Sequence, residues 1–223
     1  MTFENYFGGW TKVINKQIVK ETMQKVVIEY HNHECTPELN NIFRAFTLCD
    51  YNNLRVVFLG QDPYPQKNVA TGIAFGNKEN TDKLSPSLKV LKDAVINPLV
   101  PHGIIRFDNT LESWAKQGVL LLNSALTTEC NKIGAHVLLW RSFIIQLLQN
   151  LSYFNTGIIY VLFGEQAGGY RRYINSNLNC ILQVKHPSYF ARTNTEMDSN
   201  LFDKINDILY KNNGFKIKWY DID

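Results

Sequence analysis

An apolar run leads directly into a stiff polar cluster in the stretch Arg55-Val56-Val57-Phe58-Leu59-Gly60-Gln61-Asp62-Pro63-Tyr64-Pro65. Apolar runs of this length are typical of strands that are buried on both faces, as in a parallel sheet covered by helices. Three later stretches repeat the pattern of an apolar run that ends in polar residues, at 118–123, 158–165 and 180–188. The sequence therefore predicts four buried strands.

Helical patterns fill most of the remaining chain, at residues 16–30, 36–48, 85–96, 109–117, 135–151, 165–175 and 198–211. Two of these helices are predicted from their first residues, because Thr36-Pro37 and Ser85-Pro86 each combine an N-cap residue with proline at the first helical position. Strands that alternate with helices predict an α/β fold, a three-layer α/β/α sandwich around a central, mostly parallel four-stranded sheet. We expect residues 1–223 to form a single domain.

The bulk composition excludes few functions. The chain has 223 residues and a net charge of +3, and this mild basicity does not by itself indicate nucleic-acid binding. Its four cysteines form no CxxC pair, which favours reduced thiols in an intracellular protein. The first residues lack the basic and apolar regions of a secretory signal, and no apolar stretch approaches membrane-spanning length. We expect a cytoplasmic protein without membrane association.

The polar residues after the four strands are the candidates for chemistry. In a parallel sheet the carboxyl ends of the strands share one edge, where ligands bind in a crevice. We therefore expect Asp62, Asn123 and His186 to converge there, with Tyr64 and Phe75 beside them. Each residue taken singly has a structural alternative: Asp62 as an Asx turn, Asn123 as a strand cap, and the aromatic rings as core.

The segment that follows His186 mixes a hydroxyl, two aromatic rings and a cation, in Ser188-Tyr189-Phe190-Ala191-Arg192. This mixture is typical of insertion into a nucleic-acid groove with phosphate contacts at its flanks, although an ordinary exposed loop is the alternative. The sequence contains no GxGxxG, P-loop, HExxH or GxSxG motif, so dinucleotide, triphosphate, zincin and hydrolase-elbow interpretations lack support.

Four ordered motifs, supported by the segments 114–118 and 136–140, resemble those of family 1 uracil-DNA glycosylases: Gly60-Gln61-Asp62-Pro63-Tyr64, Ala74-Phe75, Leu120-Leu121-Leu122-Asn123 and His186-Pro187-Ser188. The resemblance covers most of the chain. It implies a monofunctional enzyme of base excision repair that flips uracil out of DNA and hydrolyses its N-glycosidic bond. It also implies that no cofactor or metal is used.

The resemblance implies a role for each matching residue in the base pocket. Asp62 would position the attacking water and stabilise the cationic sugar, and His186 would hydrogen-bond uracil O2 as the base leaves. Asn123 would read the edge of uracil, Tyr64 would exclude a C5 methyl group, and Phe75 would stack on the flipped ring. Gln61 would shape the floor of this pocket.

The resemblance also implies DNA contacts around the pocket. Residues expected to compress the DNA backbone are Pro86, Ser87, Gly164 and Ser188, and Phe190 would take the position of a wedge. Arg192 is the cation expected at a phosphate. The expected partner is uracil-containing DNA, single- or double-stranded, bound by a monomer, and a proteinaceous glycosylase inhibitor is a further candidate partner.

The chain departs from the family pattern at several positions, namely Pro65, Gly76, Glu165 and the pair Tyr189-Phe190. Most of these positions concern DNA handling rather than bond cleavage. Glu165 stands where many members have serine, and an acid there would repel a phosphate unless its side chain turned away.

Three other functions stay open at this point. A broader mismatch or damaged-base glycosylase of the same superfamily would generally carry a different residue at position 62. A DNA-binding scaffold or processivity subunit could keep the fold without catalysis. A small-molecule enzyme is a distant alternative, since it would leave residues 188–192 without a purpose. Release of free uracil from an oligonucleotide distinguishes these functions.

Overall fold

A computed structural model describes residues 2–79, 83–97 and 104–222 of the chain. Its centre is a four-stranded sheet in the order β4-β2-β6-β7, in which every neighbouring pair is parallel. The strands are β2 (Val56–Gly60), β4 (Val119–Asn123), β6 (Ile159–Phe163) and β7 (Cys180–Val184). All four predicted strands are thus present, and the predicted α/β class is confirmed.

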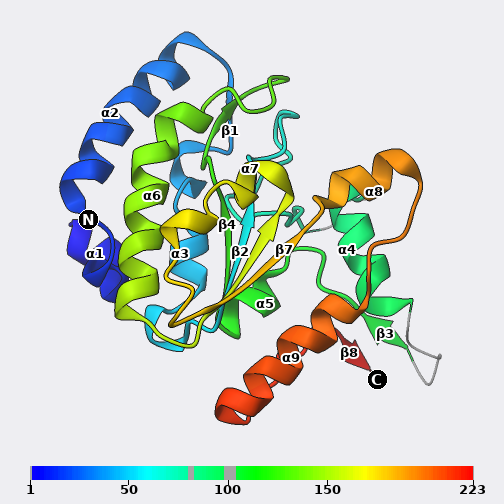
Figure 1. Ribbon diagram of the computed structural model, residues 1–223. Coiled ribbons are helices and arrows are strands. Elements are labelled where there is room, and N and C mark those ends of the chain that lie inside the picture. Colours follow the sequence, from blue (N-terminus) through cyan, green and yellow to red (C-terminus); the bar gives the residue numbers. More distant parts are fainter. Residues whose placement is uncertain (1, 80–82, 98–103, 223) are drawn as a thin grey trace.

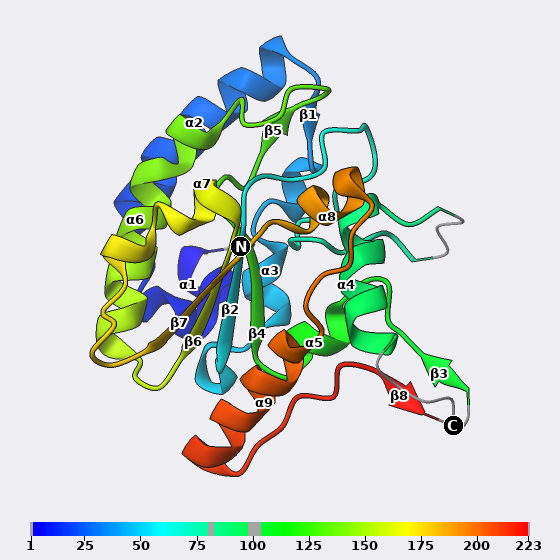
Figure 2. The same ribbon diagram turned by 45° about the vertical axis from the view of Figure 1, so that its right-hand side comes forward.

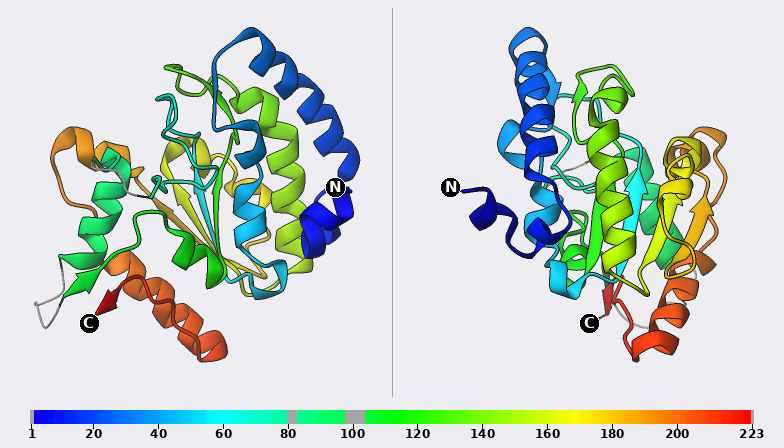
Figure 3. Two further views of the ribbon diagram at one scale, coloured as in Figure 1. Left: turned by 180° about the vertical axis from the view of Figure 1, so that it is seen from behind. Right: turned by 60° about the vertical axis from the view of Figure 1, so that its left-hand side comes forward.

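Helices cover both faces of this sheet (Figure 1). On one side lie α2 (Lys16–Asn32) and α6 (Val137–Phe154), and on the other lie α4 (Pro86–Ile96), α5 (Glu112–Lys116) and α9 (Asn200–Asn213). Shorter helices are α1 (Phe3–Phe7), α3 (Arg44–Leu48), α7 (Gly164–Gly168) and α8 (Pro187–Thr193). Figure 3 shows the same three layers from two other directions.

Burial differs between the two edge strands of the sheet, since β4 is fully covered and β7 is not. Every residue of β2, β4 and β6 is buried, whereas the edge strand β7 is only partly covered. This difference explains why the first three strands read as continuous apolar runs while Gln183 is tolerated in the fourth. The carboxyl ends of all four strands point to the same edge of the sheet, which positions the loops that follow them.

Two small antiparallel ladders lie outside the main sheet and were not predicted. The first pairs β1 (Cys35–Thr36) with β5 (Thr128–Glu129), and the second pairs β3 (Ile105–Arg106) with β8 (Asp221–Ile222). Four 3-10 helices complete the described structure, at Gly8–Lys12, Leu39–Asn41, Tyr51–Asn53 and Arg171–Tyr173.

The predicted helix start at Thr36-Pro37 is wrong. Thr36 belongs to β1, where it pairs with Thr128, and the Thr36-Pro37 peptide bond is cis. Pairing with β5 holds this segment extended, so the first full helical turns appear only in α3, from Arg44. The same sequence pattern at Ser85-Pro86 does begin a helix, as predicted.

Within the described part of the chain, no helix combines the length and the apolar character that crossing a bilayer requires. The four cysteines are all free thiols.

Candidate active site

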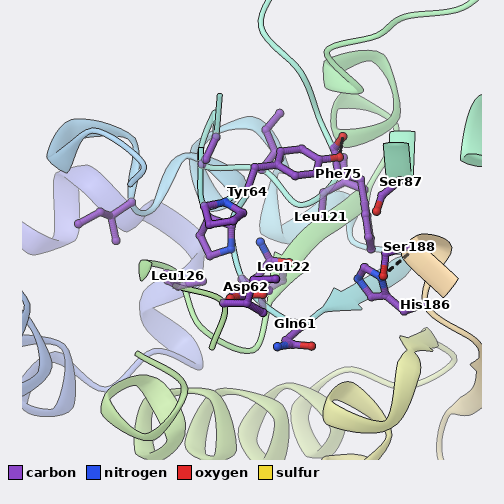
Figure 4. A pocket seen from close by; sticks show the side chains of 18 residues that line it. Gln61, Asp62, Tyr64, Phe75, Ser87, Leu121, Leu122, Leu126, His186 and Ser188 are labelled. Carbon is purple, nitrogen blue, oxygen red and sulfur yellow. Dashed lines mark hydrogen bonds between the residues drawn. The ribbon is translucent and has the colours of Figure 1, made fainter. Parts of the chain in front are cut away.

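A cavity of about 150 Å³ lies at the carboxyl edge of the sheet (Figure 4). A cavity of this size can hold a six-membered ring. Eight of the residues predicted for the site line it, namely Gln61, Asp62, Tyr64, Phe75, Ser87, Asn123, His186 and Ser188. The convergence expected from the strand ends is therefore present in the structure.

Asp62 stands two residues beyond β2 and is fixed by a contact from another loop. The backbone N–H of Gly134 donates a hydrogen bond to Asp62 Oδ2 at 2.5 Å. Burial raises the pKa of the Asp62 carboxyl, and this hydrogen bond partly offsets the rise because it favours the charged form. The result is a carboxylate held in one orientation at the wall of the cavity.

A buried network supports the loop that carries Gly134. The indole N–H of Trp140 donates to the Thr127 hydroxyl oxygen at 2.7 Å, and the same hydroxyl is hydrogen-bonded to His136 Nδ1 at 2.9 Å. His136 Nε2 then lies 3.7 Å from a carboxylate oxygen of Glu29. Burial lowers the pKa of His136, so the ring is neutral near pH 7. The network thereby joins Thr127, next to β5, to His136 at the N-cap of α6.

His186 caps α8 and lines the other side of the cavity (Figure 4). Its Nδ1 accepts the backbone N–H of Ser188 at 3.2 Å and lies 2.8 Å from the Ser188 hydroxyl oxygen. Because a backbone N–H can only donate, Nδ1 is the unprotonated nitrogen, and the neutral ring carries its proton on Nε2. Burial, assisted by the positive charge of Arg192, lowers the pKa of His186 to about 4.

Asn123 ends β4 directly opposite Gly60 in the neighbouring strand. Only 9% of Asn123 is exposed, yet in the described structure no hydrogen bond uses its side-chain amide. Gly60 is required beside it, since a Cβ there would lie 2.5 Å from Asn123 Oδ1 and 3.1 Å from the Phe75 ring. An amide that lines a cavity and has no partner among the described residues indicates a polar ligand.

Tyr64 and Phe75 are joined to each other. The Tyr64 hydroxyl donates to the Phe75 carbonyl oxygen at 2.9 Å, and burial raises the pKa of that hydroxyl, so it stays protonated. Phe75 has a φ of +67°, an unusual conformation for a non-glycine residue. Its ring meets Phe163 edge-on at 5.0 Å and lies 5.7 Å from the His186 ring. These contacts fix one wall of the cavity.

The residues predicted to contact DNA fall into two groups. Ser87 and Ser188 line the cavity, at the first turns of α4 and α8. Gly164 lies against His186 instead, since a Cβ on Gly164 would be 3.0 Å from the His186 Cβ. Pro86 is exposed on the far side of its turn and borders a separate hollow.

Phe190 and Arg192 do not line the cavity. Phe190 is partly buried against the core and borders two other hollows, one beside α4 and one beside β7. Phe190 is therefore not part of the base cavity, and its role as a wedge in the DNA stack stays a prediction. Arg192 is exposed, and its effect on the site is the electrostatic one at His186. Glu165 is exposed as well.

Among the described residues, no group of three or more histidine, cysteine, aspartate or glutamate side chains is arranged to hold a metal ion.

Comparison with known proteins identifies the family of the chain. Residues 46–210 match the family model described as the uracil DNA glycosylase superfamily. The chain belongs to this superfamily. It is 39% identical over 194 residues to the uracil-DNA glycosylase of Mycoplasmopsis pulmonis, with 86% of this chain and 85% of that protein covered. It is 36% identical over 207 residues to the Campylobacter jejuni (strain RM1221) uracil-DNA glycosylase, covering 92% and 85% respectively.

A solved structure has the same fold as this chain and belongs to the same superfamily. The mimivirus UNG variant Y322F, crystallised in complex with UGI, matches with a TM-score of 0.79 and 25% sequence identity. The match covers 92% of this chain and 83% of that one. The parallel sheet and its carboxyl edge are therefore those of solved members of the uracil-DNA glycosylase superfamily.

Sequence reasoning missed Gly134 and Ile133, which both belong to the site. Gly134 supplies the hydrogen bond to Asp62, and Ile133 lines the cavity. One signal was available for Gly134: it stands just before a predicted helix, and it has a φ of +76°, which favours glycine. Nothing in the sequence linked Ile133 to the strand ends, because its place depends on the fold of the preceding turn.

Proposed function

We propose that this chain is a monofunctional family 1 uracil-DNA glycosylase that hydrolyses the N-glycosidic bond of deoxyuridine in DNA. Free uracil and an abasic site are the products, as base excision repair requires. Superfamily membership and the close relatives support the reaction class, and the geometry of the cavity supports the roles of individual residues.

The observation that carries the mechanism is the pairing of Asp62 and His186 at one cavity in different charge states. Cleavage of a glycosidic bond passes through an oxocarbenium-like state, in which positive charge grows on the sugar and negative charge on the leaving base. Asp62, as a fixed anion, stabilises the sugar and orients water. His186, neutral with its proton on Nε2, donates a hydrogen bond to the uracil oxygen as that oxygen becomes negative. Neither role requires a metal ion.

The hydrogen-bond donors and acceptors that line the cavity determine which base is selected. Uracil offers an acceptor at O4 and a donor at N3, whereas cytosine offers the reverse pattern. The Asn123 amide, held against Gly60, satisfies uracil and leaves cytosine with unpaired polar groups, which is the strong form of discrimination. Thymine shares the pattern of uracil, so a steric wall is needed, and Tyr64 between two prolines supplies it. Phe75 stacks on the ring.

The proposed substrate is uracil in single- or double-stranded DNA, acted on by a monomer. A base inside a duplex is out of reach of the cavity, so the nucleotide must be flipped out. Ser87 and Ser188 at the cavity wall are suited to the sugar-phosphate backbone beside the flipped nucleotide, with Pro86 and Gly164 shaping the turns that hold them. We also propose that a proteinaceous inhibitor of the kind bound to the mimivirus neighbour blocks this face.

The decisive experiment measures release of free base from oligonucleotides that differ only in one pyrimidine. We expect uracil to be released, and thymine and cytosine to be retained. A processed abasic site that is cut further, through a covalent intermediate trapped by borohydride, would contradict the monofunctional reaction. DNA binding without release of any base would identify a scaffold instead.

A further inference from the structure

We propose that Ile133 is a DNA-contact residue, whose side chain packs against the nucleotide next to the flipped uridine. This inference rests on the proposed function, because it concerns DNA whose base occupies the cavity. The site of contact is the mouth of the cavity on the Asp62 side.

Ile133 differs from every other residue that lines the cavity in its exposure. Its side chain is 72% exposed, whereas the other lining residues are buried or partly buried. A single exposed isoleucine on a protein surface needs no explanation. An exposed isoleucine that also lines a ligand cavity marks the rim, and a polymer whose base fills the cavity has to pass over that rim.

The turn that carries Ile133 is held on both sides. The backbone N–H of Asn131 donates to the Pro65 carbonyl at 2.8 Å, and the Thr128 hydroxyl donates to the Lys132 carbonyl at 2.6 Å. Directly after Ile133, the Gly134 N–H is bound to Asp62. Ile133 is therefore presented in a fixed position, so a contact with it costs little additional ordering of the backbone.

The sheet order places this turn opposite α8. The turn follows β5, which comes after the edge strand β4 in the chain, and α8 follows β7 at the other edge. In Figures 1 and 2, the turn that follows β5 (residues 130–134) and α8 lie well apart above the sheet. A strand of DNA with its uridine in the cavity is thus contacted from two sides, by α8 on one and by Ile133 on the other.

The chemistry of Ile133 fits a nucleotide that has lost its stacking partner. When one nucleotide flips out, a face of the neighbouring base is exposed to water, and apolar side chains such as isoleucine are used by DNA-bending proteins to cover such faces. Phe190, the apolar residue expected for this purpose from the sequence, packs towards the core in this structure. Ile133 is the apolar side chain that the described structure leaves exposed at the cavity.

The test compares Ile133→Asn with Leu138→Asn. Leu138 is a matched control, because it is 77% exposed at the start of α6 and does not line the cavity. We expect Ile133→Asn to raise KM for a short duplex with one central deoxyuridine by about tenfold, with kcat nearly unchanged, since an apolar contact of this size is lost. Leu138→Asn and the conservative Ile133→Leu should keep the wild-type KM.

A second substrate series identifies the contacted nucleotide. In these duplexes the base on one side of the deoxyuridine, and then on the other, is replaced by an abasic spacer. We expect one of the two spacers to raise KM for the wild type but not for Ile133→Asn. If KM of Ile133→Asn equals that of Leu138→Asn, or if both spacers affect the two proteins equally, the inference is overturned. Failure of the wild type to release uracil would instead overturn the proposed function.

Discussion

The two sides of the cavity respond to burial in opposite directions. On the Asp62 side, burial raises a carboxyl pKa, and the Gly134 N–H opposes that rise. On the His186 side, burial lowers an imidazole pKa to about 4, and Arg192 adds to that change. Removal of water favours the neutral form of both groups, yet only the carboxylate receives a compensating hydrogen bond.

The outcome of this difference is an anion facing a neutral donor rather than an ion pair. A protonated His186 would add a positive charge to the cavity that Asp62 lines and would partly offset the charge of the carboxylate in the absence of substrate. With His186 neutral, the charge of Asp62 stays available for the sugar cation that forms during cleavage. The local contacts of each residue, and not its type alone, therefore determine which reaction the site can support.

Removing the charge on the Asp62 side should have the largest effect. Asp62→Asn keeps an oxygen for the Gly134 N–H but loses the anion, so we expect kcat for uracil release to fall by about a thousandfold. Binding of abasic DNA should stay close to that of the wild type. Asp93→Asn, in an exposed ion pair with Lys89, is the control and should leave kcat unchanged. Near-normal excision by Asp62→Asn would remove the central role of this carboxylate.

On the side of the cavity opposite Asp62, the variant His186→Asn separates the role of His186 as the cap of α8 from its role in catalysis. An asparagine oxygen can accept the Ser188 N–H as Nδ1 does, so α8 keeps its cap, but the donor at Nε2 is lost. We expect kcat to fall by about a hundredfold with little change in KM. The exposed His33→Asn serves as the control. A variant as active as the wild type would show that His186 acts only as a helix cap.

The charge state of His186 also predicts how stability depends on pH. Its pKa is about 4 in the folded protein, against an ordinary value of 6.5, so the unfolded chain takes up the proton first as pH falls. Stability is then present above pH 6.5 and is lost towards pH 4. Between pH 7 and pH 5, the unfolding free energy of the wild type should fall by about 2 kcal/mol more than that of His186→Asn in urea titrations. Equal losses would mean that His186 is not held neutral by burial.

The smallest effect is expected on base discrimination, from a change of Tyr64 in the cavity wall beside Asp62. Tyr64→Ala should relax the exclusion of the C5 methyl group and lower discrimination against thymine by about tenfold. The measurement is thymine release from a duplex, relative to uracil release by the same protein. Tyr170→Ala changes a buried tyrosine that does not line the cavity and controls for general loosening of the fold. Unchanged discrimination would assign the methyl exclusion to another residue.

Identical local patterns in the sequence had different outcomes in the fold. Ser85-Pro86 begins α4 as predicted, whereas Thr36-Pro37 lies at the end of β1. His186-Pro187 begins α8, although no helix was predicted at this position. An N-cap followed by proline permits a helix, and only the pairing of Thr36 with Thr128 explains why one of the three is extended.

The sequence by itself determined the four strands, the shared edge at which they end, and the set of polar residues that reaches it. It could do so because continuous apolar runs and the residues that end them are local features. Tertiary structure alone decided the contact of Gly134 with Asp62, the exposure of Ile133 at the rim and the inward packing of Phe190. These depend on chain segments far apart in sequence, whose approach is set by packing and by backbone hydrogen bonds that no local pattern encodes.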